Sequence, residues 1–203
     1  NLGNFVHRTL SFTERFFDGT IEALTENDLT EQQKEFMDKW KEGIEHYVHL
    51  GRRVRLREML MQVMKLSSQG NQYFQEAQPW KTRTENSNLA AKDIAFLNFL
   101  VKDLAIMVAP LMPATSAAIF TQLNHTPENF AQLGHLSLGK KQIGKPQVLF
   151  TKVEEKDIME LQEKHSGKQA EKTALEPEDV DLRVGKILEI KKHEKADKLF
   201  VEQ

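Results

Sequence analysis

The chain contains no cysteine, and this absence excludes two kinds of site. Neither a disulfide framework nor a thiolate metal site is possible, and the composition fits a reducing cytosol. No apolar run approaches the ~20 residues of a membrane-spanning helix, so we expect no membrane partner. The formal net charge is −2, so the chain is not a globally basic nucleic-acid binder. Any contact with RNA must therefore come from a local patch of basic residues.

Motifs that would indicate catalysis are also missing. The sequence has no glycine-rich phosphate loop, no paired carboxylates and no nucleophile with a nearby base at a convincing spacing. His46 and His49 lie three residues apart, as two ligands on one helix would, but no third ligand is spaced to complete a metal site. We therefore expect no catalytic residue, no metal and no cofactor in this chain.

With 203 residues, the chain is long enough for one domain with a core, plus a tail. Within that domain, the first half of the sequence predicts three helices. Apolar residues recur at helical spacing from Leu2 to Phe16, and Asp18-Gly19 should end this helix. A capping box at Thr30 predicts the start of a second helix. A third is expected from about Arg53 toward residue 76.

The second half predicts one central helix and a less regular tail. Residues 82–88 are polar and resemble a loop, whereas the segment from Leu89 to Val108 is apolar on more than one face and should lie at the centre of a bundle. Shorter segments follow. In order, we expect a helix at 114–123, extended chain at 133–152, a charged helix at 154–164, a linker at 166–178 and strands beginning near residues 182 and 199.

Three residues are candidates for contact with unstacked RNA bases. Asn4 and Arg8 are four apart, so a helix places them side by side on one face. Together they offer an amide and a guanidinium to the edge of a base. Trp80 directly follows Pro79, at the end of an element and near basic residues, rather than within an apolar face. Aromatic stacking combined with Arg and Asn hydrogen bonds is how proteins read single-stranded RNA.

Other polar residues are weaker candidates. Asn71, Gln75 and Glu76 lie within reach of Trp80 along a helix, where they could orient the site or read a second base; an ordinary polar helix face explains them nearly as well. The densest positive run comprises Arg52, Arg53, Arg55 and Arg57. Because Val54 and Leu56 alternate with them, only Arg53 and Arg57 would share a helix face. A solvated face is the favoured interpretation of this run, and contact with phosphates is the alternative.

Several motifs together resemble a known family. NLGNFVHR, FFDG, GNQYFQEAQPW, APLMP and QIGKPQVLF occur in the same order and at similar spacing as in the anticodon-binding domain of methionyl-tRNA synthetases, from residue 1 to about 152. The final segment, DLRVGKILEIKKHEKADKLFVEQ, resembles the start of the tRNA-binding OB domain appended to many of these enzymes. In the family, the residue matching Trp80 stacks on the first anticodon base.

The resemblance implies a fold and an organisation. The expected fold is mainly α, the helix-bundle anticodon-binding domain of a class I synthetase, with a C-terminal β segment from a truncated OB fold. The expected domains are the bundle at 1–152, a charged helix and linker at 153–178, and an incomplete OB domain at 179–203. Because the helical pattern is already established at Leu2, and the sequence stops inside a second strand, we expect a fragment of a longer protein.

The resemblance also implies a function and partners. The parent enzyme would ligate methionine to tRNA using ATP with Mg, but the HIGH-like and KMSKS-like ATP-binding motifs are absent, so the fragment itself should be inactive. The expected partner is the CAU anticodon loop of methionine tRNA, with other synthetase-complex proteins as a further class and no DNA. The wording GNQYFQEAQPWK is similar to cytosolic eukaryotic members, so we expect a cytoplasmic enzyme. Two alternatives stay open: the anticodon domain of another class I synthetase, and a non-enzymatic helical interaction module.

Overall fold

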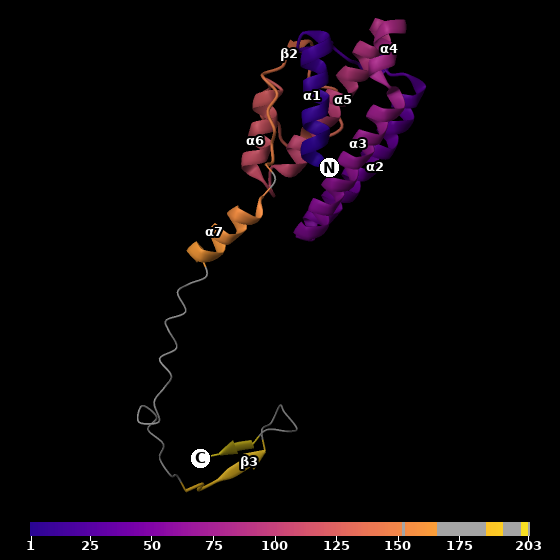
Figure 1. Cartoon of the computed structure of the whole chain (residues 1–203). Helices are drawn as coiled ribbons and strands as arrows, with labels where there is room; N and C mark the ends of the chain where they lie inside the picture. Colours follow the sequence, from indigo (N-terminus) through magenta and orange to yellow (C-terminus); the bar gives the residue numbers. More distant parts are fainter. Residues whose placement is uncertain (152, 166–185, 193–199, 203) are drawn as a thin grey trace. The chain divides into compact units, whose positions relative to one another are not determined.

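The computed structural model describes residues 1–151, 153–165, 186–192 and 200–202. The chain divides into two compact units, Asn1–Thr151 and Lys152–Gln203. The first unit is mainly helical, and within it the helices lie against one another as a bundle (Figure 1). Its elements are α1 (Leu2–Phe17), β1 (Thr20–Ile21), η1 (Glu26–Asp28), α2 (Glu31–Arg52), α3 (Leu56–Ala77), α4 (Pro79–Glu85), α5 (Ser87–Val108), α6 (Pro113–Gln122), η2 (Phe130–Gln132) and β2 (Lys141–Gln142).

The predicted helix boundaries are largely confirmed, with physical causes visible at each end. Thr30 begins α2 through the expected capping box, in which its hydroxyl accepts from Gln33 N at 3.2 Å and its own N–H donates to the Gln33 side chain at 3.0 Å. At the end of α1, Asp18 adopts the left-handed conformation together with Gly19. The β1 and β2 strands then pair antiparallel, Thr20 opposite Gln142, which ties the late extended segment to the end of α1.

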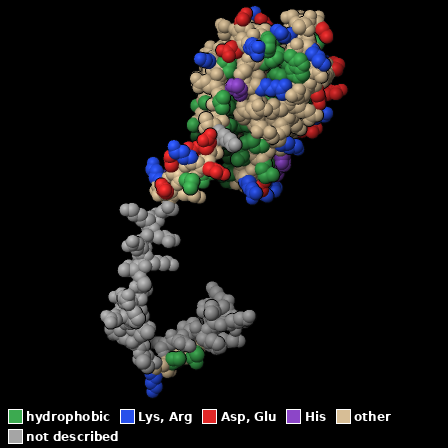
Figure 2. All heavy atoms as spheres, in the orientation of Figure 1, with side chains coloured by type: hydrophobic (Ala, Val, Ile, Leu, Met, Phe, Trp, Pro, Cys, Tyr) green, Lys and Arg blue, Asp and Glu red, His purple; other side chains and the backbone are tan. Residues whose placement is uncertain are grey.

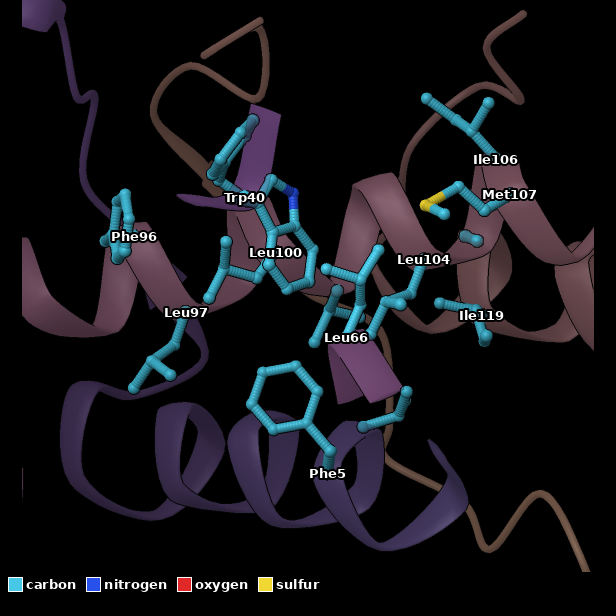
Figure 3. Close-up of a cluster of buried hydrophobic side chains, with 14 of the residues drawn as sticks. Phe5, Trp40, Leu66, Phe96, Leu97, Leu100, Leu104, Ile106, Met107 and Ile119 are labelled. Atoms are coloured by element: carbon cyan, nitrogen blue, oxygen red, sulfur yellow. The ribbon is translucent and has the colours of Figure 1, made fainter. Parts of the chain in front are cut away.

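The core is centred on α5, as its apolar pattern predicts. This helix is buried over nearly its whole length and contacts α1, α3, α4 and α6. Phe5 of α1 and Leu66 of α3 point toward Leu97, Leu100 and Leu104 of α5 (Figure 3). Burying such aliphatic and aromatic side chains contributes about 1.5–3 kcal/mol each, so the helix bundle is held together mainly around α5.

The prediction of a loop at residues 82–88 was wrong. Residues 82–85 form the end of α4 and residues 87–88 form the start of α5, so only Asn86 separates the two helices. Pro79 occupies the first turn of α4, where its missing N–H costs nothing, and the Asn86 side chain accepts from Leu89 N at 3.0 Å to cap α5. The polar composition therefore reflects the exposed end of a short helix and the residue that caps the next one.

A buried charge network holds the irregular segment after α6 against α5. Lys102 is fully buried, and its ammonium donates to the Gln132 and His135 carbonyls at 3.1 and 2.6 Å. It also lies 3.3 Å from an Asp103 carboxylate oxygen and 3.4 Å from Glu128. Lys102 therefore neutralises two acidic groups and adds a second donor to two carbonyls that also accept from His135 N and Ser137 N.

Asp103 of this network has further donors. Its carboxylate accepts from Trp40 Nε1 at 2.9 Å and from Gly134 N at 3.1 Å. Burial raises the pKa of Asp103 to about 6, although Lys102 and these hydrogen bonds favour the charged form. The network links α2, α5 and the segment near Gly134 in one place.

The second unit contains one helix and one small sheet among its described residues. The predicted charged helix is confirmed as α7 (Glu155–His165). Strand β3 (Ile190–Lys192) pairs antiparallel with β4 (Phe200–Glu202). The predicted linker at 166–178 and the start of the first predicted strand, near Leu182, lie outside the described residues. No helix in the described part of the chain is long and apolar enough to cross a membrane.

Candidate nucleic-acid interface

Helices α1 and α3 run side by side in the same direction and approach closely. At one point Asn1 Nδ2 donates to Ser68 Oγ at 2.7 Å. Further along, Gly70 of α3 lies directly against Phe5 of α1, and a Cβ on Gly70 would come within 2.6 Å of the Phe5 ring. The glycine therefore permits a helix spacing that a side chain would prevent. This spacing brings the polar residues of the two helices together.

Arg8 is the centre of the candidate interface. Its guanidinium carbon lies 4.1 Å from the centre of the Phe74 ring and 5.7 Å from that of Trp80. With the Gln75 amide oriented by the hydrogen-bond network, its oxygen accepts from both terminal guanidinium nitrogens at 2.7 and 3.0 Å. Desolvation lowers the pKa of Arg8, but an arginine stays protonated at neutral pH. Arg8 is thus a charged donor whose orientation is held by α3 and α4.

Trp80 stands at the start of α4, where the chain changes direction. Gln78 joins α3 to α4 with a φ of 45°, an uncommon conformation for a residue with a side chain. The turn places the Trp80 ring almost parallel to Phe74, with ring centres 6.1 Å apart and planes 22° apart. Trp80 is half-buried against the core. Its role is therefore partly structural, and part of its side chain remains accessible to solvent.

The other sequence candidates have different surroundings. Asn4 is exposed one turn before Arg8 on the same face of α1. Gln75 joins Arg8, as described above. Asn71 and Glu76 form contacts within α3: Asn71 Nδ2 donates to Ser67 O at 3.1 Å, and Glu76 accepts from Gln72 at 2.8 Å. The structure thus places Gln75 in hydrogen-bond contact with Arg8 and the Trp80 ring within cation–π range of the same guanidinium, with Asn4 one turn away.

Two aromatic residues of this region were not predicted as part of the site. Phe74 belongs to the periodic apolar face of α3 and has the pattern of a core residue. Its ring nevertheless stacks with Trp80 and lies under the guanidinium of Arg8. Phe16, at the end of α1, has the guanidinium carbons of Arg83 at 4.2 Å and Arg15 at 5.2 Å from its ring centre. Phe16 could have been found from the sequence because it is adjacent to Arg15, whereas Phe74 lies six residues before Trp80 and has no Trp or Arg within one helical turn.

Comparison with known proteins identifies the fold that presents these residues. The model of the anticodon binding domain of methionyl tRNA ligase matches residues 25–170. The chain belongs to this family. The matched range contains α3 and α4, including Gln75 and Trp80, and begins after α1. Curated relatives cover α1 as well: the methionine–tRNA ligase of Methanopyrus kandleri is 35% identical over 212 residues and aligns with 98% of the chain.

Other relatives give the same assignment. The methionine–tRNA ligases of Pyrococcus abyssi and Borrelia garinii are 29% and 31% identical and align with 99% of the chain. The chain spans about a third of the length of these relatives, 28–34%. Methionyl-tRNA synthetase of Mycobacterium tuberculosis in its apo form superimposes with a TM-score of 0.63 at 19% identity, over 75% of this chain and 32% of that one. The predicted helix-bundle fold of the family is thereby confirmed.

Proposed function

We propose that this chain reads the CAU anticodon of methionine tRNA as part of a methionine–tRNA ligase. The observation that carries the proposal is the Arg8 guanidinium, held by Gln75 and Phe74 beside the partly accessible ring of Trp80. Two guanidinium N–H groups are occupied by Gln75, which leaves three donors for RNA. Asn4 adds a carboxamide one turn away, with donors and an acceptor.

The geometry suits Trp80 to stacking on a base, and Arg8 and Asn4 to hydrogen bonding with base edges. Trp80 offers an aromatic surface on which an unstacked base of any identity can lie. Arg8 and Asn4 offer hydrogen-bonding groups to the edges of bases, where identity is expressed. Because Phe74 and Gln75 hold Arg8 in one orientation before RNA arrives, little side-chain entropy is lost on binding. This pre-organisation favours selection of a particular base over general attraction to phosphates.

The remaining functions of the enzyme belong to the same proposal. The family and the length of the relatives support a parent protein that binds ATP with Mg²⁺ and methionine elsewhere, with this chain inactive by itself. We place the enzyme in the cytoplasm. Other proteins of a synthetase complex are a further proposed class of partner, whereas DNA and membranes are not.

Binding should depend on the anticodon. A stem-loop with a CAU anticodon is expected to bind more tightly than one whose first anticodon base is changed, by about 1–3 kcal/mol, or roughly 5- to 150-fold, because the altered base cannot form the same hydrogen bonds. A fluorescence titration at one fixed salt concentration measures both affinities. Equal affinities for the two stem-loops would contradict the proposed function.

The guanidinium of Arg8 should not be replaceable by another cation. Arg8→Lys keeps the charge but loses the planar fork that bonds to Gln75 and faces Phe74, so the preference for CAU should fall at least ~10-fold. The matched control is Arg15→Lys on the same helix, which makes the same change at an exposed position and should keep the preference. A CAU preference that survives in Arg8→Lys would reduce Arg8 to a phosphate contact.

A further inference from the structure

The turn between α2 and α3 carries a concentrated positive charge. Arg52 ends α2, Arg53 and Arg55 lie in the turn, and Arg57 is in the first turn of α3; all four are exposed. Lys and Arg side chains gather at this end of the α2–α3 hairpin (Figure 2). Among the described residues only Arg55 of these four forms an ion pair, with Glu58 at 2.6 Å. A chain with a net charge of −2 therefore has a locally basic tip.

The turn is tight, which keeps the arginines together. Arg55 N donates back to Leu50 O at 3.0 Å, and Val54 takes a φ of 55°. A left-handed conformation is unusual for a β-branched residue. The turn breaks the helix between Arg53 and Arg57, so the expectation that these two share one helix face was wrong. Instead Arg52 lies at the end of α2, Arg53 and Arg55 lie in the turn, and Arg57 lies at the start of α3.

The basic tip, formed by Arg52, Arg53, Arg55 and Arg57, lies on the same face of α3 as Gln75. Gln75 belongs to the proposed anticodon-reading site, which also contains Arg8 and Trp80. Arg57 and Gln75 are eighteen residues apart on one continuous helix, which is about five complete turns and ~27 Å. Residues between them at three- or four-residue intervals fall on the same stripe and are exposed or half-buried: Met61, Met64, Ser68 and Asn71. None of these is acidic. The stripe therefore connects Gln75 to the basic tip without an opposing charge.

We infer that the stem of the bound RNA lies along this face of α3, with its phosphates against Arg52, Arg53 and Arg57. The inference rests on the proposed function, because the anticodon loop at Arg8 and Trp80 fixes where the stem begins. At a rise of ~3.4 Å per base pair, the ~27 Å between Gln75 and Arg57 corresponds to about eight base pairs, so a stem of that length can reach the tip. Guanidinium groups bind phosphate oxygens with charge-assisted hydrogen bonds and carry no base preference. The tip would thus contribute affinity and orientation, while the reading site contributes selectivity.

The test compares two triple variants of the whole chain. Arg52→Gln/Arg53→Gln/Arg57→Gln removes the tip charges, and Lys39→Gln/Lys41→Gln/Lys145→Gln removes the same charge from exposed lysines elsewhere. Each is titrated over a range of salt concentrations with a CAU stem-loop, a stem-loop with a changed anticodon, and a single-stranded oligonucleotide of the loop sequence alone. Circular dichroism melting establishes that both variants are folded.

The tip variant should bind the stem-loop at least ~10-fold more weakly at low salt, and its slope of log K against log salt should fall by about 2–3, near 0.9 for each phosphate that is no longer bound. Its preference for CAU and its affinity for the loop oligonucleotide should be unchanged. The lysine variant should retain most of the slope. If the tip variant keeps the wild-type slope, affinity and CAU preference, this inference alone is overturned. The basic tip would then be a candidate contact for a protein partner. Absence of CAU preference in the unmutated chain would overturn the proposed function and this inference with it.

Discussion

Lys102→Met is expected to lower the free energy of unfolding by about 3–5 kcal/mol, the usual cost of removing one partner from a buried ion pair. Met has a similar length and fills the same space, so the loss arises from charge rather than from a cavity. The substitution leaves Asp103 and Glu128 without the Lys102 ammonium, and it removes one of the two donors to each of the Gln132 and His135 carbonyls. Urea denaturation followed by circular dichroism measures the change.

The surface pair of Lys92 and Asp28 provides the matched control. Lys92 Nζ lies 3.3 Å from Asp28 Oδ1, and both side chains are about one-third exposed, 33% and 38%. Lys92→Met makes the same chemical change in a solvated setting and should cost about 0–1 kcal/mol. Equal losses in the two variants would show that the network around Lys102 does not stabilise the fold in the way its burial implies.

The pH dependence of the Lys102→Met loss follows from Asp103. In the intact protein its pKa is raised to about 6, above the ordinary 3.8. A group with a raised folded pKa binds more protons when folded, so its contribution to stability falls as pH rises from about 4 through 6. In Lys102→Met the uncompensated carboxylate can be neutralised by protonation at low pH. The loss should therefore be smaller near pH 5 than near pH 8.

Trp80→Ala should weaken binding of the CAU stem-loop by about 1–3 kcal/mol, or roughly 5- to 150-fold, because one base loses its stacking surface. Trp80 is half-buried on Phe74, so its truncation should also lower the melting temperature. Binding is therefore measured by titration well below the melting transition of the variant, with circular dichroism reporting the folded fraction.

The control that separates stacking from folding is Trp80→Phe. A phenyl ring keeps an aromatic face on Phe74 and should retain most of the affinity, whereas the loss in Trp80→Ala should persist where that variant is fully folded. If Trp80→Ala binds normally when folded, the residue is part of the core and stacks on no base. If Trp80→Phe loses as much as Trp80→Ala, the indole N–H, and not the ring face, makes the contact.

The sequence predicts the helices of the bundle well because their signals are local. The capping box at Thr30 and the apolar periodicity of α5 need no knowledge of the rest of the chain. Helix α4 was missed because polar composition is the same in a loop and in a short exposed helix. The Lys102 network was also missed. A lysine inside an apolar run gives no sign of its partners, which lie about 30 residues later in the sequence.

The candidate site was predicted in part, for the same reason. Asn4 and Arg8 are related by helical spacing, so their proximity can be read from the sequence. The contacts of Arg8 with Phe74 and Gln75 depend on how α1 lies against α3, and no spacing within one helix reveals this. Their roles toward RNA stay predictions. Three of the candidates, Arg8, Gln75 and Trp80, nevertheless form one contiguous group in the structure.

Under the proposed function, the close approach of Gly70 and Phe5 makes selectivity for the anticodon depend on a residue that contacts no base. Arg8 and Gln75 stand on different helices, and their alignment depends on a buried contact that RNA never touches. A larger residue at position 70 would push α1 away from α3 and displace Arg8 relative to Gln75, although no RNA-facing residue would have changed its identity. Variants with a weaker preference for the CAU anticodon should therefore arise at the buried contact between Gly70 and Phe5, as well as among the exposed residues.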